Sequence, residues 1–341
     1  MEPRYHDNDD FRSTREEARR GLEEALYEIK RVIVGQDAML ERMIVALLAG
    51  GHVLLEGVPG LAKTLTVKTL ADVLGGTFRR IQFTPDLVPA DLVGTRIYRP
   101  DSGRFDIELG PVFGNFLLAD EINRAPAKVQ SALLEVMQEQ QVTIGGETFP
   151  VPRPFLVMAT QNPIESEGTY PLPEAQVDRF LMKVLVDYPS TGEEAAVVGR
   201  SLDHFPDVRE RLSLENLDRY SRATQSVFVD RRVIGYAVAL ADATRNPGNY
   251  GLDDLEPYIA YGASPRGPIG LVQAARALAM LRGRSHVAVA DIRDLALDIL
   301  RHRIVLSYDG LSDGVLVDDL LERVLGAVPR PESEPHAEVA A

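Results

Sequence analysis

Hydrophobic and polar positions along this chain follow strand-like and helix-like patterns in turn over its first half. Short apolar runs that predict strands lie at 52–56, 78–83, 116–119, 155–160 and 180–186. Helical periodicity marks 37–49, 63–74 and 126–139. Strands that alternate with helices favour a parallel sheet with helices on both faces, and ligands of such sheets bind beyond the carboxyl ends of the strands. We therefore expect an α/β domain with its site at that edge.

The rest of the chain has a helical pattern. Ser13-Thr-Arg-Glu16 predicts a capping box that opens a helix running to about Arg31. Beyond Tyr188-Pro-Ser-Thr-Gly192, helical patterns lie at about 193–203, 214–227, 230–245, 264–282, 289–306 and 312–327. Asp230 and Ser264 are expected N-caps. The predicted organisation is a disordered N-terminus over 1–12, an α/β domain over 13–188, an all-α lid domain over 189–328 and a flexible tail over 329–341.

Two insertions interrupt the α/β pattern, and each predicts a hairpin. Residues 84–115 contain a segment, 97–105, that turns at Asp101-Ser-Gly103. Residues 141–151 contain Gly145-Gly146, a favoured two-residue turn that places Val142 opposite Phe149. Hairpins that protrude from a nucleotide-binding core often contact partners, and the alternative is that they only cover the core.

Residues 53–64 read Val-Leu-Leu-Glu-Gly-Val-Pro-Gly-Leu-Ala-Lys-Thr, an apolar strand followed by a Gly-rich turn. Backbone N–H groups of such a turn and the start of the next helix bind phosphates. Lys63 is expected to reach the outer phosphates and Thr64 to hold Mg²⁺. Ala62 stands where the strict motif has glycine, which the loop tolerates if Ala62 needs no positive φ. The alternative is a Gly/Pro turn with a surface lysine.

A second apolar strand, Phe116-Leu-Leu-Ala-Asp-Glu121, ends in two carboxylates. We expect Asp120 to bind the metal and Glu121 to polarise water for attack on the terminal phosphate. Asn162 follows the strand at 155–160, where its amide is suited to orient that water, although Asn before Pro is also an ordinary turn residue. The two motifs together predict that the chain binds and hydrolyses ATP.

Two arginines extend this hypothesis. Arg179 precedes the last strand, so we expect it to face the γ-phosphate of a neighbouring subunit in a ring, where a guanidinium stabilises the transition state. The alternative is a surface pair with Asp178. Arg266 lies in the first turn of the helix opened by Ser264-Pro265, from which it is expected to bend back onto the phosphates. Its alternative is a solvated arginine at a helix start.

Composition narrows the class of protein. The 341 residues are 45% hydrophobic and 26% charged, which is typical of a soluble globular protein of about two domains. A net charge of −14 disfavours nucleic acid and anionic membranes as general partners. The absence of cysteine excludes disulfides and thiolate metal sites and is consistent with a cytoplasmic location. The sequence shows neither a signal peptide nor an apolar run long enough to span a membrane.

At this point the chain resembles AAA+ ATPases of the MoxR type, within the group that carries an insertion in the second helix. The resemblance runs from about residue 14 to 327, and its most specific stretch is 118–139. The segments that carry it are Ile33–Gln36, Glu56–Thr64, Gln82–Pro89, Gly110–Phe113, Leu118–Pro126, Thr160–Pro163, Leu172–Gln176, Asp178–Phe180, Ser264–Arg266 and His302-Arg303.

The resemblance implies a role for each matching residue. The nucleotide-binding set is Val34, Gly35 and Gln36 at the adenine, then Gly57, Val58, Pro59, Gly60, Leu61, Ala62, Lys63, Thr64 and Leu65. Thr64 and Asp120 hold Mg²⁺, and the catalytic set is Glu121, Asn162 as first sensor, Arg179 as arginine finger in trans and Arg266 as second sensor. Gly267-Pro268 departs from the family's helix formers, since Pro268 removes an early helical hydrogen bond. For His302-Arg303 we expect packing or salt-bridge duty.

The function that the resemblance implies is Mg²⁺-dependent ATP hydrolysis by a hexameric ring. Such a ring remodels or assembles a protein client, often with a partner that carries a von Willebrand factor A domain. The alternatives are a nucleic-acid motor and a metal-chelatase motor subunit, which share the insertion. Arg96, Arg99 and Arg104 put positive charge on the insertion, but nearby acidic residues offset it, which disfavours the motor. A switch that binds nucleotide without hydrolysis is disfavoured because all the catalytic residues are present.

Overall fold

The computed structural model describes residues 9–58, 60–101, 103–163, 168–202 and 206–331. Its centre is a five-stranded parallel sheet, as the sequence predicts. In spatial order the strands are β2 (Phe78–Gln82), β5 (Phe116–Asp120), β8 (Leu156–Gln161), β1 (Val53–Glu56) and β9 (Met182–Leu185). Strand β8 therefore lies between the strand that precedes the Gly-rich turn and the strand that ends in the two carboxylates.

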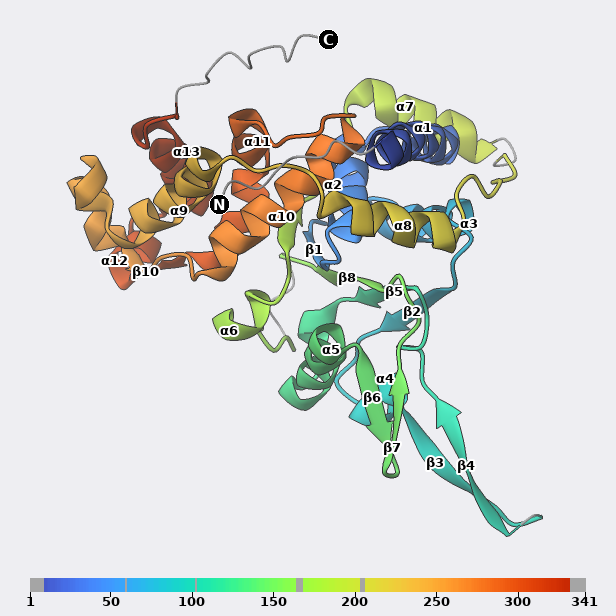
Figure 1. The fold of residues 1–341 in the computed structure, drawn as a ribbon. Helices are drawn as coiled ribbons and strands as arrows, with labels where there is room; N and C mark the ends of the chain where they lie inside the picture. The colour runs from blue at the N-terminus through green and yellow to red at the C-terminus, as the bar shows by residue number, and fades with distance from the viewer. Residues whose placement is uncertain (1–8, 59, 102, 164–167, 203–205, 332–341) are drawn as a thin grey trace.

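Helices and two hairpins surround this sheet (Figure 1). The helices of the first half are α1 (Asp9–Val32), α2 (Asp37–Leu48), α3 (Lys63–Val73), α4 (Pro89–Val93), α5 (Ala127–Glu139) and α6 (Glu174–Val177). The hairpins are β3 (Gly94–Arg99) with β4 (Arg104–Leu109), and β6 (Gln141–Ile144) with β7 (Glu147–Pro150).

The second half is almost entirely helical. Its helices are α7 (Thr191–Leu202), α8 (Leu214–Thr224), α9 (Arg231–Arg245), α10 (Arg266–Leu281), α11 (Val289–Leu300), α12 (Tyr308–Ser312) and α13 (Val317–Ala327). Short 3₁₀ turns are η1 (Ile122–Arg124), η2 (Pro247–Tyr250), η3 (Asp253–Tyr258) and η4 (Arg301–Arg303). A two-stranded sheet joins β10 (Ile259–Tyr261) to β11 (Val305–Leu306).

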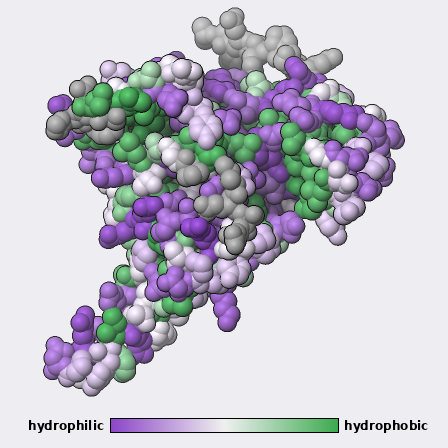
Figure 2. All heavy atoms as spheres, turned by 180° about the vertical axis from the view of Figure 1, so that it is seen from behind, coloured by the Kyte–Doolittle hydropathy of each residue, from purple (hydrophilic) through white to green (hydrophobic). Residues whose placement is uncertain are grey.

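Successive residues of each central strand enter two different cores. In β5, Phe116 and Leu118 pack into the core shared with α1, α2, α3 and the C-terminal helices. Leu117 and Ala119 pack into the core on the opposite face, which α5 and the hairpins cover. Burial on both faces explains why these strands are apolar runs without alternation. The second core ends where the hairpins project from the body, visible as an arm in Figure 2.

Four predicted details differ from the structure or lie outside its described part. Helix α1 begins at Asp9 rather than Ser13, and the Arg12–Glu16 pair at 3.8 Å joins positions one turn apart within it. Helix α11 ends at Leu300, because the next residues turn and pair with β10. Helix α13 begins at Val317, beyond Gly314 with φ +68°. The N-cap at Asp230 and the pairing of Val142 with Phe149 are confirmed, whereas 1–8 and 332–341 lie outside the described residues.

Buried ion pairs join the helical half to α2. Arg42 on α2 donates to the carboxylates of Asp294 and Asp298 on α11 at 2.8 and 2.7 Å, and its side chain is almost buried. Removal of one partner would leave a buried charge uncompensated, which is strongly destabilising. These pairs therefore tie helix α11 to helix α2, which precedes the sheet. Within the described ranges, no helix combines the length and apolar character needed to cross a bilayer.

His52, immediately before β1, is held neutral in the core. Its Nδ1 accepts from the Val157 N–H at 3.0 Å, so Nε2 carries the proton that faces the Met137 carbonyl at 3.2 Å. Burial lowers the pKa of His52 from 6.5 to about 4. The unfolded chain therefore binds a proton before the folded chain does, and the stability that neutral His52 supplies is lost as the pH falls from 6.5 towards 4.

We expect this residue to make unfolding pH-dependent. Between pH 7 and pH 5 its contribution falls by about 2 kcal/mol. In urea titrations, the difference in free energy of unfolding between the wild type and His52→Gln should shrink by that amount over this range. An equal difference at both pH values would show that His52 does not titrate between the folded and unfolded states. Burial also lowers the pKa of His302, so the variant keeps part of the wild type's pH dependence.

Candidate nucleotide-binding site

The Gly-rich turn lies between the end of β1 and the start of α3. A Cβ on Gly57 would lie 2.5 Å from the carbonyl oxygen of Val186, so only glycine fits where the turn leaves the sheet. Gly60 has φ +90°, and nothing lies within 4 Å of the position its Cβ would take. The first residue of α3 is Lys63, so the free N–H groups of that helix open into the turn. Pro59 lies outside the described residues.

Ala62 corrects one expectation. It adopts φ +54° and ψ +20° at the N-cap of α3, so the condition under which the sequence analysis accepted alanine, the absence of a positive φ, is not met. Its carbonyl accepts from both the backbone N–H and the hydroxyl of Thr66, at 2.9 and 3.0 Å. These bonds fix the turn in a conformation that costs an L-residue about 1–2 kcal/mol. The smallest side chain keeps that cost low but does not remove it.

Glycine at this position should therefore stabilise the protein. Ala62→Gly is expected to raise the free energy of unfolding by about 1 kcal/mol in denaturant titrations, because the strain at positive φ is relieved. The control is Ala71→Gly in the interior of the same helix, which should lower it by at least about 1 kcal/mol. Destabilisation by both changes would contradict the assigned backbone conformation of Ala62.

Lys63 is partly buried at the start of α3. Its Nζ donates to the Gly57 carbonyl at 2.5 Å, so the side chain folds across the turn. Burial lowers its pKa, while the charges of Asp120, Glu56 and Glu121 act in the opposite direction. The charges of three carboxylates therefore act on Lys63, and one of these carboxylates, Glu56, pairs with Lys183 at 2.7 Å. Thr64 follows at the half-buried second position of the helix, next to the same turn.

Asp120 and Glu121 lie at the end of β5, each held by neighbours that the sequence reading did not identify. Asp120 accepts from the Thr160 hydroxyl at 2.6 Å and from Arg80 at 2.7 Å. The Gln82 amide on β2 donates to Glu121 at 2.7 Å. A signal was present, since β2 runs beside β5 with Gln82 opposite Asp120, but the strand order was needed to see it.

Further contacts fix the backbone of Glu121. It has φ +57°, and its N–H donates to the Thr160 hydroxyl at 2.8 Å. Arg124 donates to the same carboxylate oxygen as Gln82, at 3.1 Å. The carboxylate is thus held by one donor from β2 and one from η1. A carboxylate held in this way is oriented, as a general base or water-positioning group requires.

Asn162 comes directly after β8 and is nearly buried. In the register of the sheet, Gln161 lies opposite Glu56 at the end of β1, and Ala159 lies opposite Ala119 in β5. Asn162 therefore emerges between the Gly-rich turn and the two carboxylates. The structure brings together at one edge the lysine, the acidic pair and the amide that the sequence predicted for one site.

An apolar cavity of about 110 Å³ adjoins the turn. Predicted residues that line it are Val34, Gln36, Gly60, Leu61, Ala62 and Leu65. Helix α7 and the segment before it contribute Pro189, Val197 and Arg200, which the sequence reading missed. Gly35 has φ +67°, and a Cβ there would lie 2.5 Å from the carboxylate of Glu193, also on α7. An apolar pocket beside a phosphate-binding turn is suited to a nucleotide base.

Arg179 and Arg266 lie at the opposite side of the sheet, near the amino ends of its strands. Both line a cavity of about 240 Å³ together with Gly50, Gly51 and His52, which directly precede β1. Arg266 therefore lies away from the Gly-rich turn of its own chain in this structure, and its contact with the phosphates stays a prediction. Its helix starts beside the loop before β9, where its guanidinium lies 3.7 Å from Asp178. Ser264 accepts the Arg266 N–H at 3.2 Å, but the helix begins at Arg266 with Pro265 as its N-cap, one residue later than predicted.

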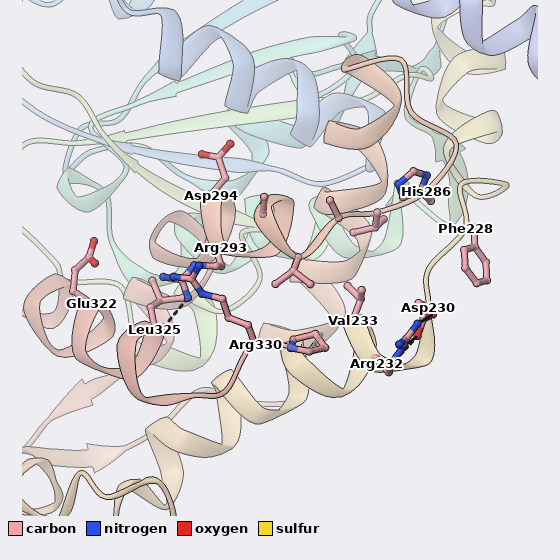
Figure 3. Close-up of a pocket in the computed structure, with 15 residues that line it drawn as sticks. Phe228, Asp230, Arg232, Val233, His286, Arg293, Asp294, Glu322, Leu325 and Arg330 are labelled. Atoms are coloured by element: carbon pink, nitrogen blue, oxygen red, sulfur yellow. Dashed lines mark hydrogen bonds and ion pairs between the residues drawn. The ribbon is translucent and has the colours of Figure 1, made fainter. Parts of the chain in front are cut away.

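A third cavity, of about 830 Å³, lies far from these residues, between α9, α11 and α13 (Figure 3). Two arginines on its walls are held by neighbouring groups. Arg293 donates to the Tyr236 hydroxyl at 2.9 Å and to the Leu325 carbonyl at 2.7 Å, and Arg232 pairs with Asp230 at 3.0 Å.

Comparison with known proteins agrees with this geometry. Residues 52–182 match the ATPase family associated with various cellular activities (AAA), and residues 254–324 match the AAA lid domain. The chain is 57% identical over 311 residues to Chaperone MoxR1 of Mycobacterium tuberculosis, which covers 91% of this chain and 82% of that protein. It is 32% identical over 327 residues to Protein MoxR of Methylorubrum extorquens, which covers 89% and 93%.

A solved structure shares the fold at full length. The crystal structure of an ATPase candidate from Cytophaga hutchinsonii superposes with a TM-score of 0.89 at 46% identity, over 94% of this chain and 98% of that one. The fold of this chain, with its parallel sheet and helical C-terminal half, therefore matches that of a solved structure over nearly the whole length of both chains. This chain belongs to the MoxR family of AAA+ ATPases, which are nucleotide-binding, chaperone-like proteins.

Proposed function

We propose that this chain hydrolyses Mg²⁺-bound ATP at a site completed by a second copy of itself. The observation that supports this proposal is the division of the predicted site between two edges of the sheet. Lys63, Asp120, Glu121 and Asn162 gather at the carboxyl edge, whereas Arg179 lies with Arg266 at the amino edge. One chain cannot bring both groups to the same phosphate.

Each residue then has a definite task. N–H groups of the turn and of α3 bind the phosphates, and Lys63 neutralises their outer charge. Thr64 and Asp120 are the Mg²⁺ ligands, and the ion would neutralise charge on the phosphate oxygens as it develops. Glu121 takes the proton of the attacking water, which Asn162 orients. The apolar pocket beside α7 holds the base.

Both arginines act on the neighbouring subunit. The Arg179 side chain is exposed, and among the residues the structure describes it forms no hydrogen bond or ion pair. The Arg266 side chain is half-exposed, and its guanidinium lies 3.7 Å from Asp178. An interface between two different edges is heterologous, so repeated contacts close into a ring when the rotation allows it. We propose a hexamer with one ATP site at each boundary.

The work of this ring is the remodelling or assembly of a protein client in the cytoplasm. Support comes from the relative named a chaperone and from the two hairpins, which extend from the body of the molecule (Figure 1) and offer a contact surface. A partner with a von Willebrand factor A domain is the expected adaptor. The pore or partner surface is then formed by residues 84–115 and 141–151.

A substrate trap tests this function. Glu121→Gln, expressed in the native cell and purified with ATP, should retain a client and its adaptor that the ADP-bound protein releases, and mass spectrometry identifies both. Lys63→Ala is the control that should retain neither. Recovery of the same proteins with both variants would contradict an ATP-dependent client.

Charge on the first hairpin disfavours the nucleic-acid motor. Arg99 pairs with Asp106 at 3.2 Å, and the Arg96 guanidinium lies over the ring of Phe105 at 4.8 Å. Contacts within the hairpin therefore already engage both arginines. The chain as a whole has a net charge of −14, which also disfavours binding to nucleic acid. A salt-dependent gel shift with DNA would favour the motor, and stimulation by a porphyrin-binding subunit would favour the chelatase.

A further inference from the structure

A buried arginine from the helical half holds the segment that carries Arg179. Arg303, in η4, has a side chain that is 3% exposed. Its Nε donates to the carboxylate of Asp178 at 2.8 Å. Its two Nη atoms donate to the carbonyl oxygens of Phe180 and Leu181 at 2.8 and 3.2 Å, and also to that of Ile299 in its own half of the chain. The guanidinium thus fixes the backbone on both sides of Arg179.

Asp178 links the same guanidinium to Arg266. Its Oδ1 accepts from Arg303, while its Oδ2 accepts from the Ser264 hydroxyl at 2.9 Å and lies 3.7 Å from the Arg266 guanidinium. Ser264 in turn accepts the backbone N–H of Arg266. The alternative surface pair of Asp178 with Arg179 is therefore not formed. One carboxylate instead connects the loop before β9 with the first turn of α10.

The neighbouring histidine supports the same segment. His302 Nε2 lies 3.1 Å from the Phe180 carbonyl, which also accepts from Arg303. Burial lowers the pKa of His302 well below its usual value, so the ring is neutral and donates through Nε2. Burial lowers the pKa of Arg303 to about 10, while Asp178 opposes the shift, so Arg303 remains charged at neutral pH. Its fork of donors is available throughout the physiological range.

We propose that Arg303 and Asp178 are positioning residues that set Arg179 and Arg266 together for the neighbouring subunit. This inference rests on the trans action proposed above. Among the residues that the structure describes, none forms a hydrogen bond or ion pair with the Arg179 side chain, so the position of this residue depends on the backbone that Arg303 holds. The same pair joins this backbone to the helical half through η4 and α10. A movement of the helical half therefore displaces both arginines at once.

Complementation of defective subunits tests this proposal. Arg303→Met should lower ATP turnover by roughly 100-fold, the effect of a small misplacement of a catalytic group, while the affinity for a fluorescent ATP analogue stays within about twofold. Co-assembled with Lys63→Ala subunits, which keep intact arginines, it should regain activity. Co-assembled with Arg179→Ala subunits it should not, because both subunits then lack a working arginine edge.

Controls separate this role from a general loss of structure. Arg42→Met removes an equally buried arginine that ties α2 to α11 without touching residues 178–181. It should lower stability but keep turnover, and it should complement Arg179→Ala. Arg303→Lys retains the charge without the fork and should recover part of the turnover. If Arg303→Met does not fold, Asp178→Asn carries the test with the same expected pattern.

Two results would overturn the inference, and they differ from failure of the proposed function. Arg303 is not a positioning residue if its variant complements Arg179→Ala, or if it loses nucleotide affinity as well as turnover. The reference pair, Lys63→Ala with Arg179→Ala, reports on the trans site itself. If mixed rings of that pair stay inactive, the proposed trans site is contradicted, independently of the role of Arg303.

Discussion

Glu121→Gln is expected to bind ATP as the wild type does and to turn it over at least about 100-fold more slowly, since general base catalysis contributes roughly 10²–10⁴. The amide keeps the size of the side chain and can still accept from Gln82 and Arg124, whose bonds to the carboxylate are 2.7 and 3.1 Å. It cannot take a proton from water. Nucleotide titration and steady-state phosphate release measure the two effects separately.

The control for this change is Glu135→Gln, an exposed position on α5 that contacts none of the site residues. It should leave both quantities unchanged. Turnover by Glu121→Gln at the wild-type rate would remove Glu121 from the chemistry. Loss of ATP binding would instead show that the carboxylate maintains the shape of the site, through its bonds with Gln82 and Arg124.

Arg179→Ala should reduce turnover by about 10³-fold or more, the usual contribution of an arginine finger, with ATP affinity preserved. Its position at the amino edge keeps it away from the turn of its own chain, so the loss is in the transition state and not in binding. Phosphate release under saturating ATP measures it. Arg231→Ala, an exposed arginine at the start of α9, is the matched control and should be active.

The sequence predicted the central sheet well because each strand is a short apolar run buried on both faces. Leu117 and Leu118 are both fully buried, one on each face of the sheet, so neither position tolerates a polar residue. The turns between elements carry glycine or proline. The Gly-rich turn and the acidic strand end could also be recognised in the sequence, because each directly follows such a strand. Their meeting at one edge follows from parallel strand direction alone.

Features that depend on strand order or on the packing of distant elements could not be predicted from the sequence. Gln82 was visible only as a polar residue on β2, and its contact with Glu121 needs β2 and β5 to be neighbours. The placement of Arg266 depends on where α10 docks, which no local pattern encodes. The left-handed φ of Ala62 could not be predicted, because the Thr66 contacts and the helix start impose it against the preference of alanine.

The division of the site between two subunits is tested most directly by mixing two inactive variants. Lys63→Ala lacks a working phosphate-binding turn but retains both arginines, and Arg179→Ala has the reverse defect. Rings assembled from the two together should hydrolyse ATP well above the sum of the separate preparations. At some boundaries the intact turn of an Arg179→Ala subunit then faces the intact arginines of a Lys63→Ala subunit, which completes the site. Activity no greater than that sum, in rings shown to contain both subunits, would contradict a site shared between neighbours.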